Sequence, residues 1–529
     1  MTTPTTFRAW RTRLTPAPWP AALGDALWGA LLGVLFALPP LAALAPLPLA
    51  ALHRRLAHSA GGPQAFRSAF WFALGFFTVH LAWLPRSMAD VLGPLGGVLT
   101  VLVLPAAALC WAAPLALTRV VFGPRTLLAL PLAWVGLEAL RTLGPLAFPW
   151  GFPGSALIPT PLAQLASLGG APLLTLLVTG TASVLAGLGG YRAPALLGTL
   201  AVWSAGLGWG LWITPGTVPT PRTALLMQGG IDPRRKAQGR TQEELQVYLG
   251  LTQGALRQGP ADLVVWPETA SPLPPSDPAV LPALQRLRIP LVVGAPGDVP
   301  GQARNSAYGV DGAVTGRQDK RVLVPFGERL PFASVLGGLY APVLGGLGMS
   351  GYTTVTPGSA LNVLPLRSLR AGVSICYESV FARLSRQAVR AGATVLVVIS
   401  NDAWFGRGAG AEQHFQLGRL RAIETRRFLL RAGNDGVSAV IDPWGRVGFR
   451  APRGERGAYR AAFDVREGQT LYTRYGDWVV WGSALALLLL LSALTRAPWR
   501  ARPDPILPMP PSRRPAERSS DLMVRLVSG

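Results

Sequence analysis

The sequence predicts a multi-pass α-helical membrane bundle of about eight spans joined to an α/β domain. Half of the 529 residues are apolar and only 14% are charged, whereas soluble globular chains carry about 25% charged residues. The apolar residues gather in residues 1–215 and in the run 478–495, while residues 216–470 alternate strand-like and helix-like segments. We therefore expect lipid to solvate one part of the chain and water the other.

Spans in the first region are expected wherever about 17–25 apolar residues follow one another, because a helix of that length crosses the hydrocarbon core. Seven segments before residue 216 are candidates. The second is short and begins at Pro39-Pro40, so the division between the first two stays open. The C-terminal run 478–495 makes an eighth span. The seven segments are 21–37, 39–53, 66–86, 95–118, 126–140, 163–188 and 194–213.

Arginine positions predict the orientation of these spans, because positively charged residues gather in cytoplasmic loops. With seven crossings before residue 216, sixteen arginines share the side of the N-terminus, and the opposite short loops hold Arg86 and Arg141. We expect both termini in the cytoplasm and residues 216–470 outside it. The net charge of +23 is then a topology signal rather than a nucleic-acid surface. The sixteen are Arg8, Arg11, Arg13, Arg54, Arg55, Arg67, Arg119, Arg125, Arg192, Arg496, Arg500, Arg502, Arg513, Arg514, Arg518 and Arg525.

The outer domain, residues 216–470, reads as sheets covered by helices, because buried β-rich runs alternate with helical ones. The Gly-rich stretch 333–352 has no clear period, so a long mobile loop with apolar tips is expected there. The basic Pro- and Arg-rich tail, 496–529, is expected to be disordered. Strands are expected at 223–228, 263–268, 290–295, 305–310, 372–376, 394–400 and 436–442, and helices at about 241–257, 278–287, 379–391 and 411–426.

Three reactive residues lie at or beside the ends of expected strands in this domain. Glu268 follows an apolar run and Pro267, Lys320 is one of two lysines, and Cys376 is one of two cysteines. Taken singly, each has an ordinary explanation as a turn carboxylate, a solvated ammonium or a core thiol. As an ordered set in separate strand contexts, they supply the parts of an acyl-transfer site.

Each of these groups has its own use in acyl transfer. A cysteine thiolate is the nucleophile, and a carboxylate within hydrogen-bond reach accepts the proton of the thiol. An ammonium and a backbone N–H group stabilise the oxyanion of the tetrahedral intermediate. Because Cys376 is expected at a strand-to-helix turn, near the positive end of a helix, we expect the pKa of its thiol to be lowered.

The ordered motifs WPE (266–268), DKRVLVPFGE (319–328), CYE (376–378) and SNDAWFG (400–406) resemble the carbon–nitrogen hydrolase (nitrilase) superfamily. In a chain with several N-terminal spans and one C-terminal span, they look like the apolipoprotein N-acyltransferase family. The resemblance covers nearly the whole chain up to the tail. It implies a nitrilase-like αββα sandwich for the outer domain.

By that resemblance, Glu268 is the general base, Lys320 the oxyanion stabiliser and Cys376 the nucleophile of a Glu-Lys-Cys triad. Four more residues are implied in supporting or substrate-binding roles, near the lysine, beside the nucleophile or along the acyl path: Glu328, Tyr377, Glu378 and Trp404. In the membrane part, LEALR, with Glu138 and Arg141, and FPWG (148–151) are also similar to the family.

The family's reaction is ping-pong. The cysteine takes an acyl chain from a phospholipid, typically phosphatidylethanolamine, and the resulting thioester acylates the α-amino group of the diacylglyceryl-cysteine at a lipoprotein's N-terminus. The resemblance thus implies phospholipid and lipoprotein partners, no cofactor, and the bacterial inner membrane. One departure is QGGIDPRRKAQ (228–238), where the family usually has QGNI and a Lys-aromatic pair; here Gly230 replaces the asparagine and Ala237 follows Lys236.

Two other classes of function stay open at this point. One is a membrane-tethered amidase or nitrilase that hydrolyses its thioester with water, and the other is a non-catalytic membrane scaffold or transporter. The four histidines show no metal-ligand spacing, and the glycines at 337–351 lack the Lys-Ser/Thr of a phosphate loop. Glu138 and Arg141 are either a functional pair at membrane depth or an ion pair that orients a helix.

Overall fold

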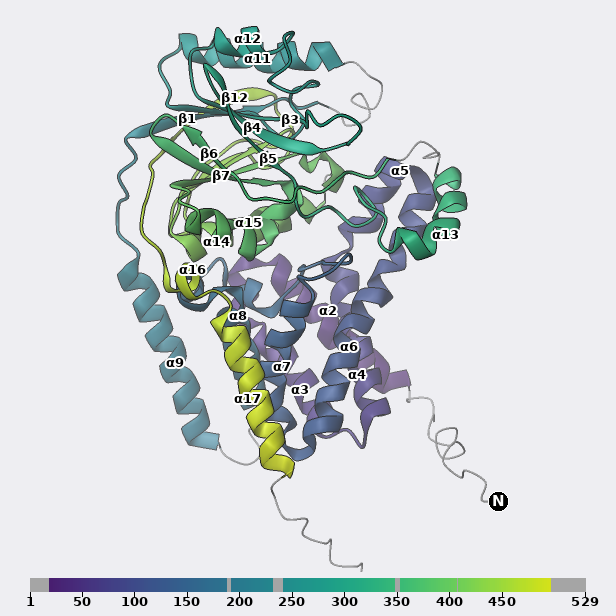
Figure 1. Ribbon diagram of the computed structural model, residues 1–529. Coiled ribbons are helices and arrows are strands. Elements are labelled where there is room, and N and C mark those ends of the chain that lie inside the picture. The colour runs from purple at the N-terminus through teal and green to yellow at the C-terminus, as the bar shows by residue number, and fades with distance from the viewer. Residues whose placement is uncertain (1–18, 188–191, 232–240, 348–352, 407, 496–529) are drawn as a thin grey trace, which may run out of the picture.

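The computed structural model describes residues 19–187, 192–231, 241–347, 353–406 and 408–495. Figure 1 shows a helical bundle at one end of the molecule and stacked sheets at the other. The chain leaves the bundle through α9 (Arg192–Ile213), forms the sheet domain, and returns through α17 (Trp478–Thr495).

The outer domain is a sandwich of two six-stranded sheets whose outer faces are covered by helices. Side chains alternate between the two faces of a strand. In β1, Ala224 and Leu226 therefore enter the core between the sheets, while Leu225 and Met227 pack beneath helices. This confirms the expected αββα layers. The covering helices are α11 (Thr241–Arg257) and α12 (Leu281–Gln285) on the first sheet, and α14 (Ala382–Arg390) and α15 (Gly410–Thr425) on the second.

Both sheets have parallel strands at the centre and antiparallel strands outside them. The first has the order β12-β1-β2-β3-β4-β5, with β1 to β3 parallel; the second has the order β11-β10-β9-β8-β7-β6, with β7 to β9 parallel. Ligand sites in such sheets form beyond the carboxyl ends of the parallel strands. The strands are β1 (Arg222–Gln228), β2 (Leu263–Val265), β3 (Leu291–Pro296), β4 (Asn305–Asp311), β5 (Ala313–Asp319), β6 (Val363–Leu366), β7 (Leu369–Ile375), β8 (Val395–Ser400), β9 (Leu429–Gly433), β10 (Ala439–Ile441), β11 (Val447–Arg450) and β12 (Gly457–Phe463).

Close packing of small and aromatic residues builds the helical bundle. A Cβ on Gly29 of α2 would lie 1.8 Å from the carbonyl oxygen of Phe72, and one on Gly75 of α4 would lie 2.0 Å from that of Ala26. Only glycine allows the two backbones to approach so closely, as is common between membrane helices. Besides α9 and α17, the bundle contains α2 (Trp19–Ala37), α3 (Pro46–Ala57), α4 (Gly62–His80), α5 (Trp83–Val101), α6 (Val103–Phe122), α7 (Thr126–Leu140) and α8 (Ala166–Ala186).

The described part of the bundle contains fewer helices that meet the length and hydropathy of a membrane span than the eight spans expected from the sequence. Among the described residues, five helical segments are long and apolar enough to cross a membrane, or six if the bent pair of α4 and the start of α5 is one span. One of the five, Leu92–Leu140, has 49 residues. It would measure about 70 Å as a straight helix, but α6 and α7 within it pack side by side (Figure 1). The expected eight spans stay a prediction.

Two expectations about local structure are wrong. The stretch 333–352 does not form a loop throughout, because Ala333–Gly346 is the helix α13. Its glycines, each about 1 kcal/mol less favourable in a helix than alanine, masked the helix in the sequence. Strands β5, β6, β9, β11 and β12 were also missed; β5, AVTGRQD, is largely polar. The four expected helices and seven expected strands each overlap an observed element.

Candidate active site

The proposed base and the lysine meet at one edge of the sandwich, where strands of both sheets end. Glu268 follows β2 and Lys320 follows β5. The Nζ atom of Lys320 lies 3.1 Å from Oε1 of Glu268 and 2.7 Å from Oε1 of Glu328. The side chain of Lys320 is only 1% exposed, so its ammonium is held by two carboxylates in a nearly dry site.

Hydrogen-bond donors surround the carboxylate of Glu268. Asn305, at the start of β4, donates to Oε1 at 2.7 Å, and the backbone N–H of Asn401, just after β8, donates to Oε2 at 2.9 Å. Burial by itself raises the pKa of Glu268, but the charge of Lys320 and these donors outweigh it and bring the pKa below its ordinary value. Glu268 is therefore an ionised acceptor at neutral pH.

The ammonium of Lys320 is stabilised by the same arrangement. Burial lowers the pKa of Lys320, but Glu268, Glu328 and then Cys376 outweigh that effect and raise it well above its ordinary value. Glu328 is itself fixed, because its Oε2 atom accepts a hydrogen bond from the backbone N–H of Val324 at 2.9 Å. A charged donor thus stands between two carboxylates, and its charge acts on Cys376 as well.

Cys376 lies at the tip of a strained turn. It follows β7 directly and begins the short helix η5 (Cys376–Val380), with a φ of 53°, a left-handed conformation that few non-glycine residues adopt. Such strain concentrates at functional sites. Next to the end of β7, the sulfur lies in the electric fields of both Glu268 and Lys320.

The expectation that the turn lowers the pKa of Cys376 is wrong. The side chain is buried, and burial together with the negative charge of Glu268 raises the pKa of the thiol above its ordinary value, although Lys320 opposes the shift. Desolvation and a neighbouring carboxylate raise the pKa by more than the positive end of η5, a helix of only five residues, can lower it. In the resting protein, Cys376 is a thiol beside an ionised carboxylate, and a base is needed to activate it.

Glu378 holds the turn at Cys376 and is not one of the two carboxylates that contact Lys320. Its Oε2 atom accepts from the backbone N–H of Ile375 at 2.9 Å, and its Oε1 atom accepts from those of Arg321 at 2.7 Å and Val322 at 3.1 Å. Burial raises its pKa, although these three donors oppose the shift. One side chain thus ties the turn at Cys376 to the segment that carries Lys320.

Tyr377 connects the turn at Cys376 to the bundle. Its hydroxyl donates to the backbone carbonyl of Ala147 at 2.6 Å, and its ring stacks on Trp150 with centroids 6.2 Å apart. The expected residue Trp404 is different: it lies in η6 (Asp402–Phe405), is 47% exposed, and stands at the surface rather than in the buried cluster.

Glu138 and Arg141 form an ion pair with N···O 3.0 Å, three residues apart at the end of α7. Arg141 also donates to the backbone carbonyls of Phe148 at 2.9 Å and Trp150 at 2.5 Å. The pair therefore holds the FPWG segment, whose Trp150 packs against Tyr377. This fits the alternative of a structural ion pair, and it links that pair to the turn at Cys376 through Tyr377.

A buried polar network beneath Cys376 was not found from the sequence. Nε2 of His414 lies 3.0 Å from the carbonyl oxygen of Cys376, and its Nδ1 lies 3.0 Å from Oδ1 of Asp402. Arg431 completes the network, with 2.6 Å to Oδ2 of Asp402. The clue in the sequence was Asp402 within the SNDAWFG motif and His414 eight residues after it.

The departure at Gly230 is accommodated by the backbone. Gly230 has a φ of 58°, and its N–H donates to the carbonyl of Asn434 at 2.6 Å. Glycine and asparagine are the residues that enter this left-handed region most readily, so glycine preserves the turn. Lys236 and Ala237 lie outside the described residues.

Comparisons with known proteins cover both parts of the chain. Residues 28–184 match the model of the apolipoprotein N-acyltransferase N-terminal domain, and residues 226–472 match the model of carbon-nitrogen hydrolase. An apolipoprotein N-acyltransferase of Azotobacter vinelandii is 34% identical over 93% of this chain and 98% of its own length. One of Geobacter metallireducens is 35% identical over 68% of this chain and 72% of its own length.

The solved structures add a more distant match. A mutant amidase of the nitrilase superfamily from Nesterenkonia AN1 is 20% identical, with a TM-score of 0.38, over 51% of this chain and 100% of its own. The sequence matches, which cover 93% and 68% of this chain, carry the assignment to a family, and this structure does not.

Proposed function

The chain belongs to the apolipoprotein N-acyltransferase family, and from that premise we propose that Glu268, Lys320 and Cys376 carry its acyl transfer. The protein is an acyltransferase with a nitrilase-like domain. One observation supports this assignment of roles. Lys320 Nζ and Glu268 Oε1 form a buried contact of 3.1 Å, and the charges of both groups act on the Cys376 thiol.

In the first half-reaction, Cys376 attacks the ester carbonyl of a phospholipid while Glu268 takes the thiol proton. The new C–S bond gives a tetrahedral oxyanion that the ammonium of Lys320 stabilises. Glu268 then returns the proton to the departing glycerol oxygen as the C–O bond breaks. The products are a thioester on Cys376 and a lysophospholipid, and the side chains have regained their initial protonation apart from the acylated sulfur.

In the second half-reaction, the α-amine of a diacylated lipoprotein attacks the thioester. Glu268 accepts a proton from the amine, the C–S bond breaks, and Cys376 recovers its proton. Because the resting state favours the thiol, the first step needs Glu268 to take the proton, and the second step returns that proton to the departing sulfur. The supporting roles follow from the contacts: Glu328 fixes the lysine, Glu378 fixes the turn, and Tyr377 fixes the turn against the bundle.

Membrane placement follows from the substrates. Each buried CH₂ of an acyl chain is worth about 0.8 kcal/mol, so a site resting on a helical bundle avoids extracting whole lipids into water. The arginines gather on the side of the N-terminus. This distribution supports an inner-membrane protein whose termini are cytoplasmic and whose residues 216–470 lie outside the cytoplasm. Phosphatidylethanolamine is the donor that the family resemblance favours.

The helix α13 is placed to admit acyl chains. It lies beside α5 in Figure 1, and Leu336 and Leu339 on it are 36% and 63% exposed. Replacing Leu336, Leu339 and Leu344 by serine makes this surface polar and should slow turnover of bilayer phospholipid. Turnover at the wild-type rate would reject the role.

The competing hydrolase differs only in what accepts the acyl group. Purified protein is given phosphatidylethanolamine and a diacylated lipopeptide, and products are identified by mass spectrometry. Triacylated lipopeptide is the expected product. Free fatty acid alone would identify a hydrolase, and product formation unchanged by Cys376→Ala would remove the thioester from the mechanism.

A further inference from the structure

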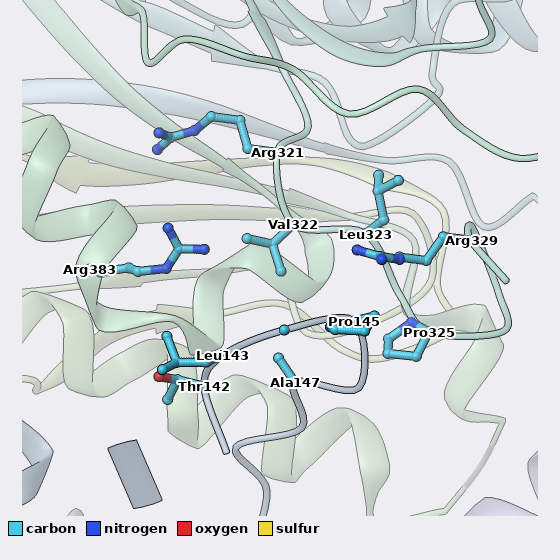
Figure 2. Close-up of a pocket in the computed structure, with 11 residues that line it drawn as sticks. Thr142, Leu143, Pro145, Ala147, Arg321, Val322, Leu323, Pro325, Arg329 and Arg383 are labelled. Carbon is cyan, nitrogen blue, oxygen red and sulfur yellow. The ribbon is translucent and has the colours of Figure 1, made fainter. Parts of the chain in front are cut away.

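A cavity lies where the outer domain meets the bundle, apart from the lysine cluster. Its volume is about 260 Å³. One wall is the loop after α7, with Leu143 and Pro145, and the other is the segment after β5, with Val322 and Leu323. Figure 2 shows Arg321 and Arg383 on one side of this cavity and Arg329 on the other, above the loop.

The three arginines form no ion pair in the described part of the chain. None of the ion pairs found there includes Arg321, Arg329 or Arg383. The side chain of Arg321 donates to the neutral amide of Gln387 at 3.3 Å. Burial lowers the pKa of Arg321; Glu378 opposes this shift and Arg383 adds to it. Three guanidinium groups thus line one small cavity, and no carboxylate of the described residues forms an ion pair with any of them.

The walls of the cavity are the same backbone that holds the reacting groups. Arg321 follows Lys320 directly, and its N–H group donates to Glu378. Ala147, on the opposite wall, accepts the hydroxyl of Tyr377. A ligand bound here therefore lies one residue away from Lys320 and, through Tyr377, beside the turn of Cys376.

We propose that this cavity binds the phosphodiester of the acyl-donor phospholipid, with Arg321, Arg329 and Arg383 as the groups that recognise it. The inference rests on the proposed function, because it names a subsite for the donor of that same reaction. Guanidinium groups pair with phosphate oxygens through two parallel hydrogen bonds. The apolar side chains of Leu143, Pro145 and Val322 face the glycerol and the first carbons of the acyl chains.

The size of the cavity fits a headgroup rather than an entire lipid. Pockets that enclose drug-sized ligands measure about 300–1,000 Å³, and this one is smaller. A lipid held by its phosphodiester here keeps its chains in the bilayer and brings its ester carbonyl toward Cys376. Because the contact is to the phosphate, phosphatidylethanolamine and other phosphodiester lipids share the site.

Binding is measured without turnover in full-length Cys376→Ala protein, by calorimetric titration in detergent with monomeric short-chain phosphatidylethanolamine. Replacing Arg321, Arg329 or Arg383 singly by glutamine should weaken binding about tenfold or more, as loss of a hydrogen bond to a charged group does. The matched control is Arg286→Gln, at an exposed position just after α12, which changes the net charge equally. It should leave the affinity unchanged.

Two further ligands identify the source of the phosphate. Short-chain diacylglycerol, which has no phosphate, should bind weakly and equally to all variants, and inorganic phosphate should compete only weakly with the lipid. Lipid affinity that survives all three substitutions would overturn the proposal. So would arginine-dependent binding of inorganic phosphate with unchanged lipid affinity, which would mark a site for a free anion.

This test separates the two proposals. If wild-type protein makes no triacylated lipopeptide, the proposed function fails, whereas the calorimetric result on Cys376→Ala protein does not depend on turnover. Arg383 is exposed, so Arg383→Gln keeps the fold and a measurable affinity even if a more buried substitution lowers the melting temperature.

Discussion

Replacing Glu268 by glutamine separates the chemistry of this carboxylate from its structural role. The side chain keeps its size but loses its charge and its ability to take a proton. General-base catalysis contributes about 10²–10⁴-fold to rate. We therefore expect the rate at which an acyl group is loaded onto the thiol to fall by about that factor.

The structure also gives the cost in stability. All three partners of Glu268 are donors: Lys320 and Asn305 at Oε1, and the N–H of Asn401 at Oε2. Whichever way the amide is turned, its NH₂ group faces a donor. An unsatisfied buried donor costs about 1–3 kcal/mol, so the melting temperature in detergent should fall modestly while the protein stays folded.

The matched control is Asp319→Asn, the residue before Lys320. Asp319 is also a buried carboxylate whose partners are donors, with Arg304 at 2.6 Å and Ser306 at 2.7 Å. It should lower the melting temperature by a similar amount but slow acylation by less than about tenfold. Both rates are read from acylated protein over time by intact mass spectrometry. Equal rate losses in the two variants would refute the assignment of Glu268 as the base.

Three other predictions follow from the contacts. Acylation of wild-type protein should not change with pH between about 6 and 8, because the pKa of Glu268 lies below its ordinary value and that of Cys376 above it; stopped-flow rates that rise tenfold per pH unit would indicate a preformed thiolate. Tyr377→Phe loses the hydrogen bond to Ala147 and should slow acylation several-fold with a small change in melting temperature. A wild-type rate would show that acylation does not depend on this contact between the turn and the bundle. Gly75→Leu should prevent stable folding, since even a Cβ meets a backbone oxygen at 2.0 Å; normal yield of monodisperse protein on size-exclusion chromatography would contradict the close packing.

Much of the fold was readable because its signals are local. Apolar runs mark the bundle, and β-branched runs such as TVLVVIS mark the buried central strands. Among the missed strands, β5 (AVTGRQD) is largely polar, whereas β6 (VLPL) and the central strand β9 (LLRAG) are only four and five residues long. Helix α13 was missed because its glycines give the segment a low helix propensity. Its position beside α5 depends on tertiary packing, which the sequence does not display.

The candidate site divides in the same way. Glu268, Lys320 and Cys376 stand out by residue type and position, but their mutual distance depends on two sheets closing together. The pKa of Cys376 was mispredicted because burial and the proximity of Glu268 do not appear in the sequence. His414 was overlooked because its contact with the Cys376 carbonyl joins residues 38 apart in the chain.

The most direct test of the central claim is to trap the acyl group. Full-length protein is incubated with phosphatidylethanolamine without an acceptor, digested, and analysed by mass spectrometry. We expect one hydroxylamine-sensitive acyl adduct, on Cys376, that disappears when a diacylated lipopeptide is added and appears far more slowly in Glu268→Gln. An adduct on another residue, or triacylated product from Cys376→Ala protein, would contradict it.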